Sequence, residues 1–154
     1  MRRRQAITLL ALVGCFVSLY LWLYKIGIIG SLQCGAGGCE TVQTSRWAEL
    51  LGLPVALYGV VGYAVLFALS LAALQPRLVT SRRLTWTVAA LATVGFLFTV
   101  YLTYLELFVI NALCRWCVVS AGIMTAIWVV AVLDLRAGGN PGALPRGQPT
   151  QAGI

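Results

Sequence analysis

The sequence predicts an all-α membrane protein, a four-transmembrane-helix bundle with a cysteine-bearing extracytoplasmic loop between the first two helices. Of its 154 residues, 60% are hydrophobic and only 10% are charged, a composition far from that of soluble domains. Four apolar runs are each about 20 to 25 residues long, and a helix needs about 20 residues to cross a hydrocarbon core of about 30 Å. The basic residues are divided unevenly between the connections, which indicates how the helices are oriented.

The expected helices cover residues 5–24, 54–74, 84–108 and 112–133, and their only charged residues are Glu106 and Arg115. Lipid offers the backbone no hydrogen-bonding partners, so each run must satisfy its own peptide groups as a helix. The first run begins like a signal peptide, and residues 12–15 resemble a lipoprotein cleavage site. Its apolar character continues to Tyr24, however, so we expect an uncleaved helix in which Cys15 is a buried, inert thiol.

The distribution of the positive charge favours membrane orientation over nucleic-acid binding. The chain has 11 Lys and Arg against 4 Asp and Glu, a net charge of +7. One side of the expected membrane has only Lys25, Arg46 and Arg115, and basic loops stay in the cytoplasm. We therefore expect a multi-pass protein of the bacterial plasma membrane, with both termini in the cytoplasm and the first loop outside. The expected cytoplasmic basic residues are Arg2, Arg3, Arg4, Arg77, Arg82, Arg83, Arg136 and Arg146.

The chain divides into an expected membrane domain, residues 1–136, and a tail, residues 137–154. The tail is rich in Gly and Pro, which predicts a disordered cytoplasmic segment. In the long first loop, Val42, Trp47, Leu50 and Leu51 fall on one face of an expected short interfacial helix.

Five cysteines and no histidine concentrate the possible chemistry on sulfur. The sequence CRWC places Cys114 and Cys117 at the start of the fourth helix. With Asn111 as the expected cap, Cys114 lies in the first turn, where free N–H groups and the helix dipole favour its thiolate. Three-residue spacing puts both sulfurs on one helix face, close enough to bridge, with Cys117 one turn deeper toward the bilayer.

The other pair, Cys34 and Cys39, lies in the glycine-rich loop sequence CGAGGC. A disulfide that closes so short a loop constrains the unfolded chain little, so it is a poor staple and a plausible labile bond. Disulfides persist outside the bacterial plasma membrane, where both pairs are expected. The hypothesis is a relay: a substrate thiol reduces the loop pair, a loop thiolate attacks Cys114, and the released Cys117 passes electrons to a lipid-soluble quinone.

Two alternatives compete with this relay, and one acidic residue has two interpretations. Four outward thiolates suit tetrahedral zinc, although the oxidising side and the different depths of Cys114 and Cys117 argue against it. A non-catalytic four-helix membrane protein stapled by disulfides is the second alternative.

Glu106 either serves proton transfer to a quinone or simply reaches the membrane interface.

The chain resembles the vitamin K epoxide reductase family, in its bacterial thiol-oxidising branch. The resemblance rests on both cysteine pairs, the C-x-x-C on the fourth helix, and the topology. Further matches are SLY at residues 18–20 with Lys25 after it, SRW at 45–47, GLPVALYGVVGY at 52–63, VYL at 100–102, and Phe108.

The resemblance implies a four-helix bundle around a quinone, menaquinone or ubiquinone, with no metal. It implies that Cys34 and Cys39 are shuttle cysteines, that Cys39 pairs with Cys114, and that Cys117 faces the quinone. The implied thiol partner is a thioredoxin-like protein of the periplasm or extracytoplasmic side that acts in trans. Membrane lipid is expected to surround the helices. The implied candidates for the pocket wall and its loop cap are Trp47, Val42, Tyr58 and Leu102, beside the acid Glu106.

Two positions depart from the animal members of the family. Those enzymes carry an Asn at the start of the second helix and a Tyr after the C-x-x-C motif, and both hydrogen-bond vitamin K. The corresponding residues here are Val55 and Ala121. The departure favours quinone reduction over epoxide reduction.

Overall fold

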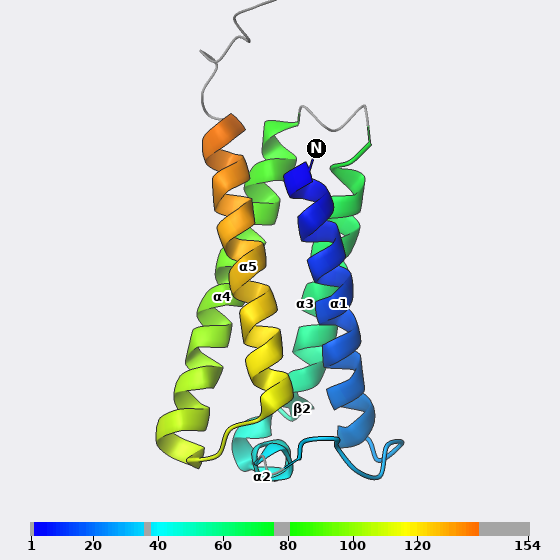
Figure 1. The fold of residues 1–154 in the computed structure, drawn as a ribbon, viewed down its shortest axis with the longest axis vertical. Coiled ribbons are helices and arrows are strands. Elements are labelled where there is room, and N and C mark those ends of the chain that lie inside the picture. Colours follow the sequence, from blue (N-terminus) through cyan, green and yellow to red (C-terminus); the bar gives the residue numbers. More distant parts are fainter. Residues whose placement is uncertain (1, 36–37, 76–80, 139–154) are drawn as a thin grey trace, which may run out of the picture.

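Four long helices run side by side, and the loop between the first two folds across one end of the bundle (Figure 1). The computed structural model describes residues 2–35, 38–75 and 81–138. The long helices are α1 (Arg2–Lys25), α3 (Val55–Ala72), α4 (Arg82–Tyr104) with its π-helical extension η2 (Leu105–Ile110), and α5 (Arg115–Gly138). Four helices in the described residues are long and apolar enough to cross a membrane, which confirms the predicted fold class.

The expected cap of the fourth helix was wrong, whereas the helix ends lie within about five residues of their expected places, with α5 running from Arg115 to Gly138 instead of from 112 to 133. Asn111 does not cap α5; it adopts the left-handed conformation, φ 53°, and ends the preceding helix. The Ala112 N–H then donates to the Glu106 carbonyl oxygen over 3.1 Å, so α5 begins only at Arg115. Asn tolerates this conformation better than most residues, which explains why the turn falls here. Residues 139–154, most of the expected tail, lie outside the described residues.

The first loop does not contain the single interfacial helix that Val42, Trp47, Leu50 and Leu51 suggested. It forms α2 (Cys39–Thr44), the 3₁₀ turn η1 (Arg46–Ala48) and a small hairpin of β1 (Glu49–Leu50) and β2 (Leu53–Pro54). Helix α2 ends because Ser45 adopts an extended backbone conformation, with ψ 152°. The Ser45 hydroxyl donates to the Val42 carbonyl over 2.7 Å. Positive φ angles at Leu51 and Gly52 make the two-residue hairpin turn.

Helix packing leaves one side of the bundle more open than the others. Helix α1 packs extensively against α3 and α5, and α4 packs against α5, whereas α3 and α4 touch little. Gly14 permits the close approach of α1 to α3, because a Cβ at this position would overlap the Tyr63 ring. Large apolar side chains such as Phe16 and Leu97 point outward, as lipid-facing side chains do.

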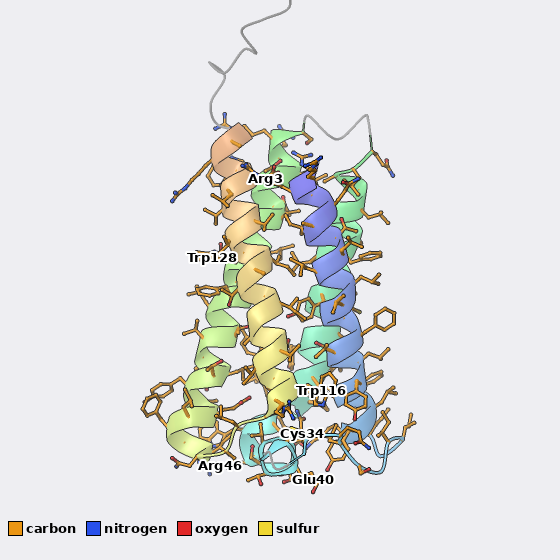
Figure 2. The ribbon with its side chains drawn as sticks, in the orientation of Figure 1. Arg3, Cys34, Glu40, Arg46, Trp116 and Trp128 are labelled. Atoms are coloured by element: carbon orange, nitrogen blue, oxygen red, sulfur yellow. A yellow bond between two sulfur atoms is a disulfide. The ribbon has the colours of Figure 1, made fainter. Side chains whose placement is uncertain are left out.

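At the end of the bundle opposite the loop, one arginine makes polar contacts with several helices. Arg4 on α1 pairs with Asp134 on α5 at 3.2 Å and donates to the Ala73 carbonyl, after α3, over 3.1 Å. It also donates to the Thr85 hydroxyl of α4 over 3.0 Å. Figure 2 shows the neighbouring Arg3 at this end, far from Cys34 and Arg46. Arg4 thus links α1 to all three other long helices.

We expect Arg4→Leu to destabilise the bundle by about 2–3 kcal/mol, because several partly buried polar groups lose a charged partner. Thermal unfolding in detergent, followed by circular dichroism, measures the loss. Arg3→Leu is the matched control, since the exposed Arg3 side chain makes one hydrogen bond, to the Leu133 carbonyl. Equal effects of the two substitutions would contradict the assignment.

Candidate redox site

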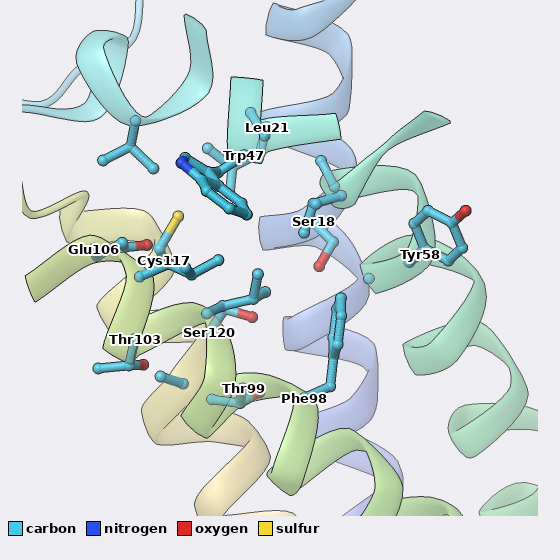
Figure 3. Close-up of a pocket in the computed structure, with 18 of the residues that line it drawn as sticks. Ser18, Leu21, Trp47, Tyr58, Phe98, Thr99, Thr103, Glu106, Cys117 and Ser120 are labelled. Carbon is cyan, nitrogen blue, oxygen red and sulfur yellow. The ribbon is translucent and has the colours of Figure 1, made fainter. Parts of the chain in front are cut away.

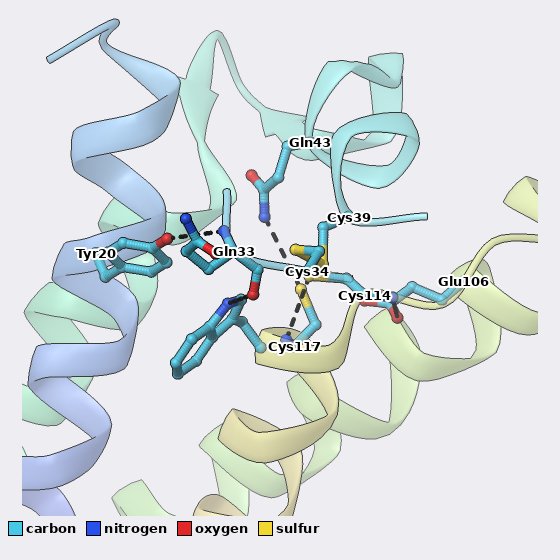
Figure 4. The surroundings of a disulfide bond; sticks show 9 residues. Tyr20, Gln33, Cys34, Cys39, Gln43, Glu106, Cys114 and Cys117 are labelled. Atoms are coloured by element: carbon cyan, nitrogen blue, oxygen red, sulfur yellow. Dashed lines mark hydrogen bonds between the residues drawn. A yellow bond between two sulfur atoms is a disulfide. The ribbon is translucent and has the colours of Figure 1, made fainter. Parts of the chain in front are cut away.

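The two cysteine pairs meet at the loop end of the bundle. Cys34 and Cys39 form a disulfide, while Cys114 and Cys117 are free thiols. The disulfide and Cys114 belong to one buried cluster, against which Cys117 packs. Figure 4 shows all four cysteines gathered where α5 begins. Cys39 and Cys114 are both 0% exposed, so within this arrangement their sulfurs are sealed from external thiols and can react only inside the cluster.

Two ring side chains hold the loop beside Cys34. The Gln33 N–H donates to the Tyr20 hydroxyl over 3.1 Å, and the Gln33 carbonyl accepts from the Trp116 indole N–H over 3.3 Å. The two rings pack together with centroids 5.2 Å apart. Since Trp116 lies inside the C-x-x-C sequence, the helix that carries Cys114 and Cys117 also fixes the loop disulfide.

The backbone of the loop approaches the turn before α5 very closely at Gly38. A Cβ built on Gly38 would lie 2.7 Å from the Cβ of Ala112, so only glycine fits without a shift. This contact brings the start of α2, and with it Cys39, onto the turn that leads to Cys114. The glycines of the loop therefore serve close packing here as well as conformational freedom.

Cys114 immediately precedes α5 rather than lying in its first turn. Its carbonyl accepts the first helical hydrogen bond, from the Val118 N–H over 3.0 Å. Its sulfur accepts from the Cys117 N–H over 3.4 Å, the bond that a capping side chain makes with the third helical residue. The Cys114 thiolate is still favoured at this position, because a capping sulfur faces the same free N–H groups as a residue of the first turn.

A hydrogen bond from the Cys117 thiol lowers the pKa of Cys114 below its ordinary value, aided by the Cys117 N–H and opposed by burial and the Glu106 charge. A lowered pKa means that the reactive thiolate is present at lower pH than in a free cysteine. We expect Cys117→Ala to raise this pKa when both proteins also carry Cys34→Ala and Cys39→Ala, which keep Cys114 a free thiol. Ultraviolet absorbance of the thiolate during a pH titration, corrected with Cys114→Ala, measures it; an unchanged midpoint would contradict the stated cause.

Glu106 faces the cysteines rather than the membrane interface. It is 6% exposed, and its carboxylate accepts a hydrogen bond from the Cys114 N–H over 3.2 Å. The carboxylate also lies within hydrogen-bonding reach of the Cys117 thiol. It belongs to η2, and π-helical turns are frequent at functional sites because they re-aim side chains. The interpretation of Glu106 as a residue that only reaches the interface is wrong.

An apolar cavity of about 160 Å³ lies beneath the loop, bounded by all four long helices (Figure 3). Cys117 is the one cysteine among the described residues that line it. The cavity therefore meets the buried sulfur cluster through Cys117, the deeper sulfur of the C-x-x-C pair. The predicted pocket residues all lie on its wall: Val42, Trp47, Tyr58, Leu102 and Glu106.

A second hollow adjoins this cavity on the side where α3 and α4 touch little. It measures about 300 Å³ and shares wall residues with the first, among them Trp47, Phe98 and Leu102. Its rim includes Arg46, whose guanidinium lies 5.0 Å from the centre of the Trp47 ring.

Several polar residues of the cavity wall were missed from the sequence. Thr103 and Thr99 lie on α4 one and two turns before Glu106, and this spacing in a transmembrane helix is a signal that the sequence does contain. Ser120 follows Cys117 by three residues on α5, and the Tyr63 hydroxyl donates to its carbonyl over 2.8 Å. Gln43, which also lines the cavity, gave no such signal because α2 could not be foreseen.

The cysteine arrangement gives the zinc alternative no ligand set. In the described ranges, no three Cys, His, Asp or Glu side chains converge as a metal site would require. Two of the four sulfurs are already bonded to each other. Tetrahedral thiolate zinc needs four free, convergent sulfurs.

A loop disulfide packed on buried Cys114 and half-buried Cys117, among four apolar helices of spanning length, is the arrangement expected of a membrane-embedded oxidoreductase of the thiol–disulfide class. Residues 5–132 match the family model described as the Vitamin K epoxide reductase family. The chain belongs to this family, as its cysteine pattern indicated. Members are membrane oxidoreductases that couple disulfide chemistry to quinones.

Proposed function

We propose that the protein is a membrane thiol oxidase and quinone reductase that makes disulfides de novo, in the bacterial thiol-oxidising branch of the family. Electrons pass from a thioredoxin-like partner through Cys34 and Cys39 to Cys114 and Cys117, and then to a membrane quinone. One observation carries the proposal: the loop disulfide packs on sealed Cys114, while Cys117 lines an apolar cavity.

The thiol half of the reaction begins at Cys34, since Cys34 keeps 5% of its surface exposed whereas Cys39 has none. A partner thiolate attacks Cys34 and releases the Cys39 thiolate; the second partner thiol then displaces Cys34, and the partner leaves as a disulfide. Cys39 attacks the Cys114–Cys117 disulfide at Cys114 and releases Cys117 as a thiolate. Cys34 then displaces Cys114 and restores the Cys34–Cys39 bond. The structure has the oxidation state that this exchange leaves, with an intact loop disulfide and a reduced C-x-x-C pair.

The quinone half returns the C-x-x-C pair to its disulfide. Cys117 transfers two electrons to the quinone at the cavity wall, and Cys114 closes the bond with Cys117. The partner dithiol loses two electrons and two protons in a full cycle, and the quinone gains both to become quinol. Glu106 lies beside both thiols and the cavity, so it is placed to pass a proton between them.

The wall of the cavity favours a quinone over an epoxide. Val55 and Ala121, which stand at the two departures from the animal enzymes, both line it and offer no hydrogen-bonding side chain. Menaquinone and ubiquinone both have a flat head that suits an apolar wall with a few polar groups.

Charge supports a topology with both termini in the cytoplasm and the cysteines outside, in a bacterial plasma membrane. Arg2, Arg3, Arg4 and Arg136 lie at the end of the bundle opposite the loop. Lys25, Arg46 and Arg115 lie at the loop end, and the more basic side stays inside. The partner is then a separate extracytoplasmic protein.

Anaerobic turnover tests the proposed function. Purified protein is mixed with a reduced thioredoxin-like protein and a soluble quinone, and quinol formation is followed. We expect one quinol for each partner disulfide formed. No quinol, across ubiquinone-type and menaquinone-type analogues and several thiol donors, would overturn the proposal.

A further inference from the structure

One buried polar side chain, from the loop that covers the cavity, touches the Cys117 sulfur, the deeper sulfur of the C-x-x-C pair. Gln43, on α2, is 7% exposed and lines the apolar cavity. Its carboxamide nitrogen donates to the Cys117 sulfur at 3.9 Å, within range for a hydrogen bond to sulfur (Figure 4). Among the described residues this is the one hydrogen bond that the carboxamide makes, so a second N–H remains available at the cavity wall.

The base of this side chain is held firmly. The Lys25 ammonium group at the end of α1 donates to the Gln43 backbone carbonyl over 2.9 Å and pairs with Glu49 at 3.1 Å. Gln43 follows Cys39 by four residues, so both side chains lie on the same face of α2. The helix that brings Cys39 to Cys114 therefore brings Gln43 to Cys117.

Other polar side chains that line the cavity do not donate to Cys117. Ser18, Trp47, Thr99 and Thr103 have donors on the wall, but none makes a hydrogen bond to Cys117 within the described residues. The remaining groups have their donors engaged elsewhere or have none to give. The Ser45 hydroxyl donates to the Val42 carbonyl, and the Tyr58 hydroxyl to the Leu50 carbonyl over 3.0 Å. The Tyr63 hydroxyl is occupied by Ser120, and the Glu106 carboxylate accepts rather than donates when ionised. Gln43 thus differs from them in presenting a spare N–H beside the reacting sulfur.

We infer that Gln43 is the donor that holds the Cys117 thiolate and a carbonyl oxygen of the quinone together. One N–H stabilises the thiolate released when Cys39 attacks Cys114. The other bonds the quinone oxygen, on which negative charge develops as electrons arrive from Cys117. No atom is transferred to or from Gln43. This inference rests on the proposed function and assigns it a quinone-binding residue.

Gln43→Met and Gln43→Glu test the inference, with Thr44→Val as control. Methionine keeps the length of the side chain without its N–H groups, and glutamate keeps the shape but places an acceptor beside a thiolate. Thr44, next on α2, is exposed, and in the described part of the chain its hydroxyl bonds only to the Glu40 carbonyl of the same helix. The KM and kcat for a soluble ubiquinone analogue are measured, together with the stopped-flow rate at which the thiol donor reduces Cys34–Cys39.

We expect Gln43→Met to lower kcat/KM for quinone about tenfold through a higher KM, and Gln43→Glu to lower it about 100-fold. In both Gln43 variants we expect the rate of reduction of the loop disulfide to stay within about twofold of the wild-type rate. For Thr44→Val we expect this rate and the quinone kinetics to stay within the same range. Unchanged quinone kinetics in Gln43→Met, with an active wild type, would overturn this inference and leave the proposed function standing. So would an equal loss in the thiol half, which marks a purely structural role. A wild type that is inactive with ubiquinone-type and menaquinone-type analogues and with several thiol donors would overturn both.

Discussion

Cys117→Ala is expected to trap a disulfide between Cys39 and Cys114 and to reduce quinol formation by about a thousandfold or more. In this variant the Cys114 thiolate can attack the loop disulfide at Cys39, which lies in the same sealed cluster and releases Cys34 as a thiol. Cys117 can no longer attack Cys114, so the bond is lost only when the released Cys34 attacks Cys39, and alkylation of the Cys34 thiol before digestion preserves it. Mass spectrometry of non-reduced peptides identifies the linked pair.

Cys15→Ala is the matched control for this trap. Cys15 is a free cysteine of α1 that packs against the other core cluster, away from the loop disulfide. We expect wild-type turnover and an unchanged Cys34–Cys39 bond. Two results would contradict the relay: turnover by Cys117→Ala, or a trapped bond from Cys114 to Cys34 instead of Cys39.

Glu106→Gln is expected to lower kcat for quinol formation about 100-fold, the usual range for the loss of a proton-transfer group. The amide oxygen of glutamine still accepts from the Cys114 N–H, so the turn before α5 keeps its geometry. The fold and the thiol half of the reaction should therefore persist, while protons no longer pass through this side chain. The measurement is kcat as a function of pH, in wild type and variant.

Thr103→Val is a suitable control, because Thr103 lines the same cavity from α4 without touching the cysteines in any described hydrogen bond. We expect the pH dependence of wild type to be retained in this control and flattened in Glu106→Gln. A Glu106→Gln enzyme with wild-type kcat would assign Glu106 a structural role, as the acceptor for a buried N–H.

The sequence was sufficient for the bundle because lipid imposes a strict rule on the backbone. Each apolar run had to form a helix of spanning length, and four such helices appear where four runs were found. The spacing of the two cysteine pairs and their positions relative to the helices were also enough to indicate the family, which the match over residues 5–132 confirms.

The residues at which the helices of the first loop and α5 begin and end could not be predicted from the sequence. The pattern of the first loop fitted a helix, yet positive φ angles at Leu51 and Gly52 and the extended Ser45 divide it into α2, η1 and a hairpin. The start of α5 moved to Arg115 because Asn111 ended the previous helix in a left-handed turn. Such choices depend on contacts between segments far apart in the chain, as with Gly38 and Ala112.

By itself the sequence determined the four spans, the two cysteine pairs and their presence at one end of the bundle, because helix formation in lipid and alternate connection of helices are consequences of composition and order. Tertiary structure alone decided that Glu106 turns inward, that Cys114 caps α5 and that Gln43 reaches Cys117. These facts depend on angles and distances of a few ångströms between helix ends. Such distances are set by packing and by local hydrogen bonds, which no periodicity in the chain records.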